Sequence, residues 1–363
     1  MEKKIVVIAA GGTGGHLFPA AAFAEEMRQR GWRIVLMTDA RGRRFAESFP
    51  AERVEDVPAA SPTANPLKAI PALLKIWRGV NEAKRRFSEL KPSLVAGFGG
   101  YPSFPALMAA RARRVPILIH EQNSVLGRVN RALATSAAAI ACGFERLDRM
   151  PASARARKHV TGNPVRPPIL AVREKPYPES PAGGRLNLLI IGGSQGARVF
   201  GEVIPLAIAM LPEALRARLD VVHQVREEQL ADAREVYAVA AVKAEAAPFF
   251  TNMGELLSAA HLVIARAGAS TVTELEAAGR PAILIPFAAA ADDHQTANAE
   301  SLTDVGAADI FSEADFTPQA LAARLELRLS DPHGLAVRAA AARAAGKPEA
   351  AKSLADLAES VAA

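Results

Sequence analysis

Two short segments of this chain are suited to hold a phosphate group, because each joins an apolar run to a glycine-rich loop that opens a helical pattern. Residues 5–10 lead into a Gly-Gly-Thr-Gly-Gly-His loop at 11–16, and residues 186–191 lead into Gly-Gly-Ser-Gln-Gly at 192–196. Glycine lets the backbone approach a ligand closely, and the first N–H groups of a helix are unpaired and electropositive. Each loop is therefore predicted to cradle a phosphate or a sugar diphosphate, and the repetition indicates two nucleotide-type α/β domains.

The first loop does not match the dinucleotide fingerprint G-x-G-x-x-G. With Gly12 and Gly14 in the first two positions, the third falls on Leu17. Asp39, at the end of the second apolar run, still occupies the place of the acid that holds an adenine ribose, so an NAD(P) oxidoreductase remains an alternative. His16, where the loop meets the helix, is suited to act as a general base or donor, or else packs against the loop.

A third strand-loop-helix pattern covers residues 265–274. Its small residues suit a diphosphate, and Glu274 in the first helical turn is placed to accept both hydroxyls of a ribose. Thr271 and Glu274 also have the spacing of a capping box, which needs no ligand. Local sequence leaves both interpretations open.

Polar side chains follow two further apolar runs, His-Glu-Gln-Asn at 120–123 and Asp-Asp-His-Gln at 292–295. Such strand ends are suited to grip sugar hydroxyls, although each is also compatible with a solvated loop. No Asp-x-Asp pair is present, so we expect neither a metal nor a cofactor. Stabilisation of a leaving group would then fall to helix dipoles and to basic side chains such as Arg166.

Residues 65–87 combine an apolar stripe with basic side chains. The stripe consists of Leu67, Ile70, Leu73, Leu74 and Trp77. Such a helix is suited to rest on an anionic membrane surface, but the same spacing is typical of a helix that faces its own core.

The elements that must position these residues alternate between apolar strands and helical patterns. In the first half strands are predicted at 5–10, 34–38, 94–96, 115–120 and 138–141, and in the second half at 186–191, 219–224, 249–250, 262–265 and 282–286. This alternation predicts two doubly wound parallel sheets, with ligands at the carboxyl ends of the strands. The proline-rich, basic residues 146–185 are predicted to be the linker, and the alanine-rich end is predicted to form two helices broken at 346–348.

Composition and charge limit the possible partners. The chain has 363 residues, 50% of them hydrophobic, and a net charge of +6, which indicates two packed domains and anionic partners such as phosphates, anionic lipid or nucleic acid. The apolar run near the start is too short for a secretory signal, and no run approaches the roughly 18 residues of a membrane-spanning helix. The single cysteine, Cys142, is predicted to be buried in a protein of a reducing compartment.

Seven ordered motifs resemble those of the MurG family, the bacterial N-acetylglucosaminyltransferases that convert lipid I to lipid II in peptidoglycan synthesis. The matching segments span nearly the whole chain and lie at residues 11–19, 97–103, 120–123, 161–166, 192–197, 266–271 and 292–296. The resemblance implies a GT-B fold with two Rossmann-like domains. It implies an acceptor-binding and membrane-binding domain at residues 1–162, to which a helix at about 346–363 returns, and a domain for UDP-N-acetylglucosamine at 163–345.

The resemblance also assigns roles by motif position. Phe250 would offer its backbone to uracil, Glu274 would bind the ribose, and the diphosphate would lie against Ser194, Ala269, Ser270 and Thr271. Asn123, His294 and Gln295 would address the sugar and Arg166 the nucleotide, while Thr13, Gly14 and Gly15 would form the loop nearest the acceptor. One departure is the run of four alanines at 288–291, where relatives are expected to carry a larger side chain that contacts the donor.

The implied reaction inverts the anomeric centre, so a base must deprotonate the 4-hydroxyl of the acceptor. His16 is the first candidate base and Glu121 the second. The partners expected are UDP-N-acetylglucosamine, lipid I and an anionic membrane surface, with no nucleic acid. The expected location is peripheral, on the cytoplasmic face of the bacterial inner membrane. Alternatives are a UDP-N-acetylglucosamine 2-epimerase, a glycolipid glycosyltransferase and a non-catalytic membrane scaffold.

Overall fold

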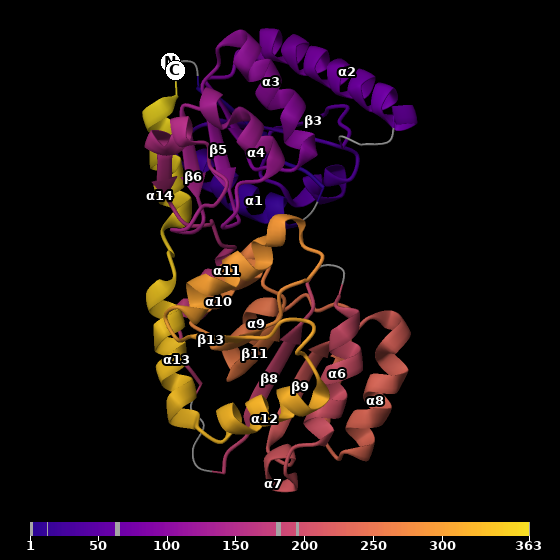
Figure 1. Cartoon of the computed structure of the whole chain (residues 1–363). Helices are drawn as coiled ribbons and strands as arrows, with labels where there is room; N and C mark the ends of the chain where they lie inside the picture. Colours follow the sequence, from indigo (N-terminus) through magenta and orange to yellow (C-terminus); the bar gives the residue numbers. More distant parts are fainter. Residues whose placement is uncertain (1–2, 13, 62–65, 179–182, 194–195, 363) are drawn as a thin grey trace. The chain divides into compact units, whose positions relative to one another are not determined.

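The computed structural model describes residues 3–12, 14–61, 66–178, 183–193 and 196–362, with the backbone alone at 44–46 and 66–68. The chain divides into two compact units (Figure 1). Unit 1 comprises Met1–Arg166 and Lys347–Ala363, and unit 2 comprises Pro167–Gly346.

Unit 1 is built on a parallel sheet in which seven strands are described, in the order β3-β2-β1-β4-β5-β6-β7. Their bounds are β1 (Ile5–Ala9), β2 (Arg33–Thr38), β3 (Arg53–Asp56), β4 (Leu94–Gly97), β5 (Ile117–Glu121), β6 (Ala139–Cys142) and β7 (Lys158–Val160). The order reverses beside β1, so the loops after β1 and β4 meet at a switch point, where doubly wound sheets bind ligands.

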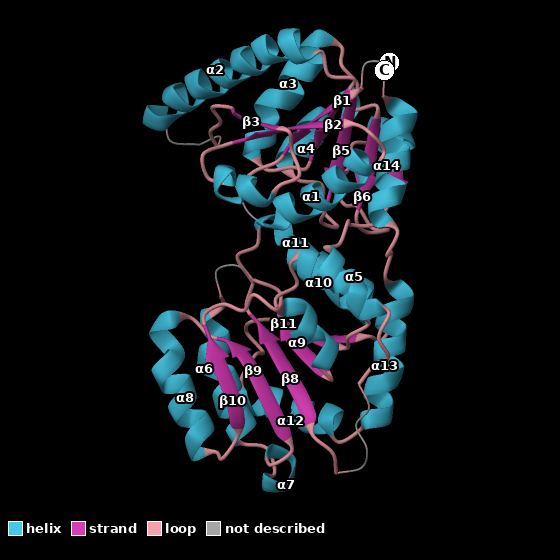
Figure 2. Cartoon of the chain, turned by 180° about the vertical axis from the view of Figure 1, so that it is seen from behind, coloured by secondary structure: helices cyan, strands magenta, loops and turns pink. Residues whose placement is uncertain are grey.

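Helices cover both faces of this sheet (Figure 2). They are α1 (Gly14–Gln29), α2 (Pro66–Leu90), α3 (Phe104–Arg113), α4 (Arg128–Leu133) and α14 (Ala350–Val361), with 3₁₀ turns η1 (Gly42–Ser48), η2 (Tyr101–Ser103), η3 (Ala134–Ser136) and η4 (Ala152–Arg157). Side chains alternate along β1, so Val6 and Ile8 enter one core cluster while Val7 and Ala9 enter the other. Parallel strands buried on both faces read as continuous apolar runs, which is why the sequence pattern reveals β1.

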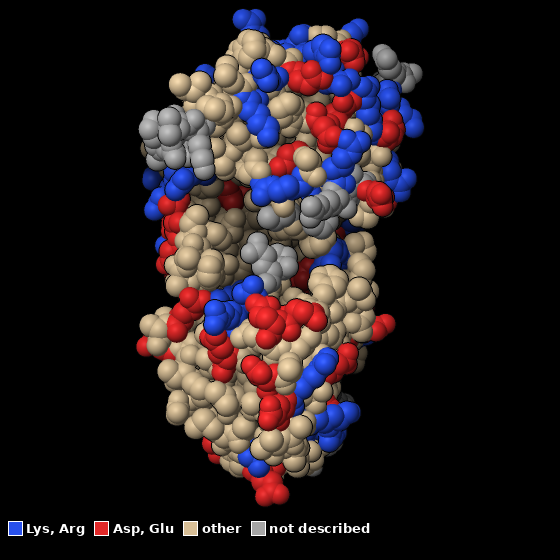
Figure 3. Space-filling view, turned by 90° about the vertical axis from the view of Figure 1, so that its right-hand side faces the viewer, with Lys and Arg blue, Asp and Glu red and all other residues tan. Residues whose placement is uncertain are grey.

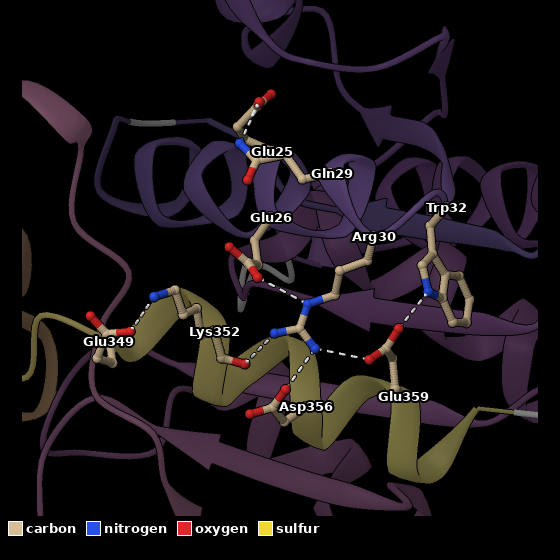
Figure 4. A network of polar contacts seen from close by, with 9 residues as sticks. All are labelled: Glu25, Glu26, Gln29, Arg30, Trp32, Glu349, Lys352, Asp356 and Glu359. Atoms are coloured by element: carbon tan, nitrogen blue, oxygen red, sulfur yellow. Dashed lines mark hydrogen bonds and ion pairs between the residues drawn. The ribbon is translucent and has the colours of Figure 1, made fainter.

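The C-terminal helix α14 belongs to the core of unit 1. Leu354 and Ala358 lie in the same buried cluster as Phe23 of α1. Around this contact Arg30 donates to Asp356 at 2.6 Å and to Glu359 at 2.8 Å (Figure 4). The chain therefore returns to its first unit after completing the second.

Unit 2 repeats the plan with a parallel sheet in which six strands are described, in the order β10-β9-β8-β11-β12-β13. Its strands are β8 (Leu186–Ile191), β9 (Leu219–Gln224), β10 (Lys243–Ala247), β11 (Leu262–Ala265), β12 (Ala282–Leu284) and β13 (Ala308–Ile310). Its helices are α5 (Pro167–Arg173), α6 (Arg198–Ala209), α7 (Glu213–Arg216), α8 (Leu230–Val239), α9 (Met253–Ala259), α10 (Ala269–Ala278), α11 (His294–Thr303), α12 (Pro318–Leu329) and α13 (Pro332–Ala345), with η5 (Glu227–Gln229) and η6 (Ala291–Asp293). The predicted pair of doubly wound α/β domains is confirmed.

Three details of the prediction are wrong. Residues 146–185 are not a plain linker, because β7 and α5 lie within them. The apolar pair Phe249 and Phe250 is not a strand but follows β10, whose Lys-Ala-Glu-Ala-Ala sequence carries no apolar run. The pattern also misses β3, β7, β10 and β13, which are the edge strands of the two sheets. Edge strands pair on one side only and tolerate exposed polar residues.

Candidate active site

The first glycine loop of unit 1 connects β1 to α1 and depends on glycine at particular positions. Gly12 has φ +85°, in the left-handed region. A Cβ on Gly11 would lie 2.6 Å from the Cβ of Pro102, and one on Gly14 would lie 2.8 Å from the ring of Phe18. Gly15 is exposed at the start of α1, and Thr13 lies outside the described residues.

The imidazole of His16 lies in the first turn of α1, against the loop that follows β4. Its ring atoms come within 3.3 to 3.6 Å of the positions that Cβ atoms on Gly99 and Gly100 would occupy. The Nδ1 atom lies 3.1 Å from Oε1 of Gln122, at the end of β5. The loops after β1, β4 and β5 thus converge on this half-buried histidine, as expected for the carboxyl edge of a doubly wound sheet.

Behind Gln122 lies a second, fully buried histidine. His120 Nδ1 is 2.9 Å from Nε2 of Gln122, and His120 Nε2 is 3.3 Å from the carbonyl oxygen of Gly162. Burial lowers the pKa of His120 to about 4. The ring is therefore neutral near pH 7.

The carboxylate of Glu121 organises its own loop. Oε1 accepts from the backbone N–H and the side-chain amide of Asn123, at 3.1 and 3.2 Å. Oε2 accepts from the backbone N–H of Gly127 at 2.9 Å and from Nδ2 of Asn130 at 2.8 Å. Both oxygens of this buried carboxylate are thereby engaged in holding Asn123 and the start of α4.

Arg166, the last residue of the first segment of unit 1, stacks on an aromatic ring of the same unit. Its guanidinium carbon lies 4.7 Å from the ring centroid of Phe18, which follows the glycine loop in α1. A guanidinium stacked on an aromatic ring keeps its positive charge and its N–H donors, while the stacking restricts the conformations of the side chain. The structure thus brings Arg166 to the glycine loop of unit 1.

In unit 2, Gln224 at the end of β9 ties the second glycine loop to the segment after β10. Its Oε1 accepts from the N–H of Gly192 at 3.0 Å, and its Nε2 donates to the carbonyls of Gly193 and Pro248 at 3.0 and 3.2 Å. The half-buried Phe250 follows this anchored segment. Ser194 lies outside the described residues.

Helix α10 begins at Ala269, with Gly268 as its N-cap and no side-chain hydrogen bond at the cap. Thr271 is therefore the third helical residue and Glu274 lies in the second turn, so neither the capping box nor the first-turn position of Glu274 is correct. Ala269 is buried, while Ser270, Thr271 and Glu274 are half-buried. A helix start without a side-chain cap keeps N–H groups for a ligand such as a phosphate.

The loop between β12 and α11 is held by Arg266, a residue that the motif contained but that had no predicted role. Its guanidinium carbon lies 5.1 Å from the ring centroid of Phe200 and 5.3 Å from that of Phe287. It donates to the carbonyl oxygens of Ile285 and Pro286 at 3.1 and 3.3 Å and pairs with Glu313. The sequence could have indicated a role for Arg266, because this residue directly follows the apolar strand at 262–265.

His294 and Gln295 open α11 just beyond this loop. Nδ1 of His294 donates to the carbonyl oxygen of Ala291 at 2.8 Å, so in the neutral ring Nε2 carries a lone pair. Oε1 of Gln295 accepts from the N–H of Phe287 at 2.9 Å, which ties the start of the helix to the end of β12. The four alanines at 288–291, between Phe287 and His294, are mostly exposed.

The apolar stripe on α2 faces solvent rather than the core. Ile70, Leu73, Leu74 and Trp77 are 68, 64, 52 and 64% exposed, and the side chain of Leu67 lies outside the described residues. The helix buries its other end, through Ala83 and Phe87. The interpretation in which this stripe faces the core of its own domain is therefore wrong. On the surface of unit 1, Lys and Arg side chains are abundant (Figure 3).

Two features bear on partners. No helix among the described residues is both long enough and apolar enough to span a bilayer. Within the same residues, no three His, Cys, Asp or Glu side chains gather as a possible metal site.

Known proteins resemble this chain in sequence and in fold. The model of the glycosyltransferase family 28 N-terminal domain matches residues 6–142, and that of the family 28 C-terminal domain matches residues 187–355. A UDP-N-acetylglucosamine–N-acetylmuramyl-(pentapeptide) pyrophosphoryl-undecaprenol N-acetylglucosamine transferase of Maricaulis maris is 54% identical, covering 98% of this chain and 97% of that protein. The protein of the same name from Caulobacter vibrioides is 50% identical over 99% of both chains.

Solved structures agree with these relatives. The crystal structure of Acinetobacter baumannii MurG matches with a TM-score of 0.79 and 33% identity, covering 99% of both chains. The glycosyltransferase of kitacinnamycin matches with a TM-score of 0.69 at 17% identity over 100% of both chains, which indicates a shared fold.

Proposed function

The chain belongs to glycosyltransferase family 28 and to its MurG-type members, and from this premise we infer that it transfers N-acetylglucosamine from UDP-N-acetylglucosamine to the undecaprenyl-pyrophosphoryl N-acetylmuramyl pentapeptide. The product is lipid II, the disaccharide precursor of peptidoglycan. The observation in the structure that carries the chemistry is the convergence of three loops of unit 1 on His16.

We propose that His16 is the base that takes the proton of the acceptor hydroxyl. It is half-buried at the switch point of the sheet, and its ring is held in place by Gln122 and by the glycines after β4. Both oxygens of Glu121, in contrast, already accept hydrogen bonds within their own loop. A carboxylate used in this way is a poorer proton acceptor, so the geometry favours His16 over Glu121.

On the acceptor side, the first glycine loop is proposed to lie nearest the lipid-linked substrate. The residues concerned are Thr13, Gly14 and Gly15. Gly14 admits no side chain without displacing Phe18, and Gly15 is exposed at the helix start. Both properties suit a backbone that must approach a bulky anionic substrate.

On the donor side, unit 2 is proposed to bind UDP-N-acetylglucosamine. The N–H groups at the start of α10, at Ala269, Ser270 and Thr271, together with Ser194, would hold the diphosphate, and Glu274 would accept the ribose hydroxyls. Phe250 would offer its backbone to uracil.

Four further side chains are proposed to contact the donor. In unit 2, His294, through Nε2, and Gln295 would bind sugar hydroxyls. In unit 1, Asn123 would address the sugar and Arg166 the nucleotide.

We also propose that the exposed stripe on α2 rests on an anionic membrane at the cytoplasmic face. Four large apolar side chains more than half exposed on one helix are unusual for a surface that faces only water. Lys75 and Arg78, both exposed, lie on the same stretch and are suited to anionic headgroups. A polyprenyl-linked acceptor resides in such a surface.

The test of the function is release of UDP from UDP-N-acetylglucosamine, with and without a soluble lipid I analogue, in the presence of a metal chelator. We expect release that needs the acceptor and survives the chelator. Replacement His16→Gln should abolish most of it, whereas His159→Gln, at an exposed histidine of β7, is the matched control. Release that is indifferent to acceptor would refute the transferase and favour an epimerase.

A further inference from the structure

Three side chains of unit 1 form one continuous chain of hydrogen bonds that ends at His16. From the interior outward, the chain runs from the carbonyl oxygen of Gly162 to His120, from His120 to Gln122, and from Gln122 to His16, with distances of 3.3, 2.9 and 3.1 Å. His120 and Gln122 are both buried, and His16 is half-buried. The chain therefore connects the interior of the unit to the proposed base.

The positions of the protons follow from the interior end. A carbonyl oxygen can only accept, so Nε2 of His120 carries a proton and donates to Gly162. Because burial keeps the ring of His120 neutral near pH 7, its Nδ1 carries a lone pair. That lone pair must accept a hydrogen bond, and Nε2 of Gln122 supplies it.

The amide of Gln122 can consequently take only one orientation. Its Nε2 lies 2.9 Å from Nδ1 of His120 and 3.2 Å from the carbonyl oxygen of His120, so both amide protons find acceptors. A flipped amide would set its oxygen against a lone pair and a carbonyl oxygen at once, leaving buried groups unsatisfied. With this orientation Oε1 points to His16, and an amide oxygen can only accept.

We propose that His120 and Gln122 are positioning residues that hold neutral His16 with its proton on Nδ1, so that the lone pair of Nε2 is the acceptor for the proton of the attacking hydroxyl. Nε2 lies 3.4 Å from the Cβ position of Gly100, in the loop after β4. This inference deepens the proposed function and rests on it for the role of Nε2, whereas the tautomer follows from the hydrogen bonds and from the neutral, buried ring of His120.

The proton balance of the step is simple. The hydroxyl oxygen forms a bond to the anomeric carbon, the bond from that carbon to the UDP oxygen breaks, and its electron pair leaves with UDP. The hydroxyl proton passes to Nε2 of His16. The resulting imidazolium still donates from Nδ1 to Gln122, and an amide oxygen is too weak a base to pass the proton inward.

The first experiment reads the tautomer without any substrate. We would label the seven histidines with ¹⁵N and record long-range ¹H–¹⁵N correlations at about pH 8, where an ordinary imidazole is neutral. The His16 signals are identified by their loss in His16→Gln. We expect the Nδ1 shift of a protonated nitrogen and the Nε2 shift of an unprotonated one. The opposite pattern in the wild-type protein overturns the proposal.

The positioning role is tested with two variants and a matched control. Gln122→Met keeps the volume but removes the acceptor, and His120→Phe removes the group that orients the amide, so both should weaken the preference for Nδ1–H. His223→Phe removes another fully buried histidine, in unit 2, and should leave the His16 signals unchanged. Tautomer ratios that stay at the wild-type value in Gln122→Met contradict a role for Gln122.

Kinetics then separate this inference from the proposed function. We expect Gln122→Met to lower kcat by about 10- to 100-fold, in the range of lost outer partners of a functional histidine, with little change in KM for UDP-N-acetylglucosamine. A larger effect on KM than on kcat would assign Gln122 to substrate binding and overturn the positioning role. If the wild-type tautomer is as expected but no acceptor-dependent release of UDP occurs, the proposed function fails while the tautomer assignment stands.

Discussion

Replacing Leu73 and Trp77 on α2 by serine should weaken binding to anionic vesicles without impairing the fold. Both side chains are 64% exposed. Complete burial of a leucine contributes about 2 kcal/mol, and the roughly 200 Å² of a tryptophan contributes about 25 cal/mol per Å². Transfer of the exposed parts of both side chains out of water is therefore favourable by about 4 kcal/mol. If only the outer half of each enters the interface, about 2 kcal/mol remains, so the affinity should fall by about 30- to 1000-fold.

The assay is co-sedimentation of the protein with vesicles that contain anionic phospholipid, over a range of vesicle concentrations. Raising the salt should weaken wild-type binding, because Lys75 and Arg78 would contribute about 1 kcal/mol each at low ionic strength. Leu327→Ser on α12, a leucine 58% exposed in unit 2, is the matched control and should bind as the wild type does. The thermal midpoint should change little in either variant, since exposed substitutions rarely alter stability by more than about 0.5 kcal/mol.

Two results would refute this reasoning. One is a double variant that binds vesicles as tightly as the wild type. The other is an equal loss in Leu327→Ser, which would mean that general hydrophobicity and not the α2 stripe drives the binding. Turnover of a soluble acceptor analogue provides a further check, because α2 contributes no residue to the proposed site and the double variant should keep the wild-type rate.

Three further predictions concern the site and the fold. His16→Gln should lower kcat by about 10²- to 10⁴-fold, the usual contribution of a general base, and a loss below tenfold in the UDP-release assay would contradict its role. Arg30→Met removes the contacts to Asp356 and Glu359 and should lower the free energy of unfolding by about 1 to 2 kcal/mol. Urea unfolding measures this change, with Arg28→Met on the exposed face of α1 as the control. Equal unfolding midpoints for the two variants would exclude a role of Arg30 in holding α14. Burial lowers the pKa of His223 to about 3, below the unfolded value of about 6.5, so its contribution to stability is full above about pH 6.5 and declines as the pH falls toward 3, by about 2 kcal/mol between pH 6.5 and 5. His223→Phe should therefore flatten the loss of unfolding free energy between pH 7 and 5, and an unchanged slope would be incompatible with this assignment.

In both units a loop at the carboxyl edge of the sheet leads from a strand into a helix, but the surrounding residues differ. In unit 1 the glycine loop after β1 leads into the helix that carries His16, and the neighbouring strand ends supply buried polar partners. In unit 2 the start of α10 has no side-chain cap, and Gln224 and Arg266 hold the loops around it by hydrogen bonds to backbone carbonyls. One unit thus fixes the orientation of a histidine, and the other presents N–H groups suited to an anion.

Central strands are readable from sequence and edge strands are not. β1 and β11 are buried throughout and appear as continuous apolar runs, and β8 is apolar except for Asn187. β7 and β10 lie at sheet edges and carry lysine, histidine and glutamate. Because water can satisfy the free side of an edge strand, its composition is hardly constrained, and a pattern search has no signal to find.

Local spacing also misleads where the start of a helix is undecided. Thr271 and Glu274 have the spacing of a capping box, but α10 begins at Ala269, so that the motif falls inside the helix. The spacing of the α2 stripe fits a core-facing helix equally well, yet these side chains are exposed. In both cases the sequence specifies the period of the pattern, while packing against the rest of the unit decides what the pattern contacts.

The sequence by itself determined the two α/β domains, the glycine loops and their order, and the family, because each depends on residues that are neighbours along the chain. Only the tertiary structure decided which side chains meet. His16 and Gln122 are 106 residues apart, and α14 reaches Arg30 across more than 320 residues. Such contacts also engage both carboxylate oxygens of Glu121 in hydrogen bonds and place the proton of His16 on Nδ1. A hydrogen bond is specified by the distance and direction between atoms, and local sequence does not contain this information.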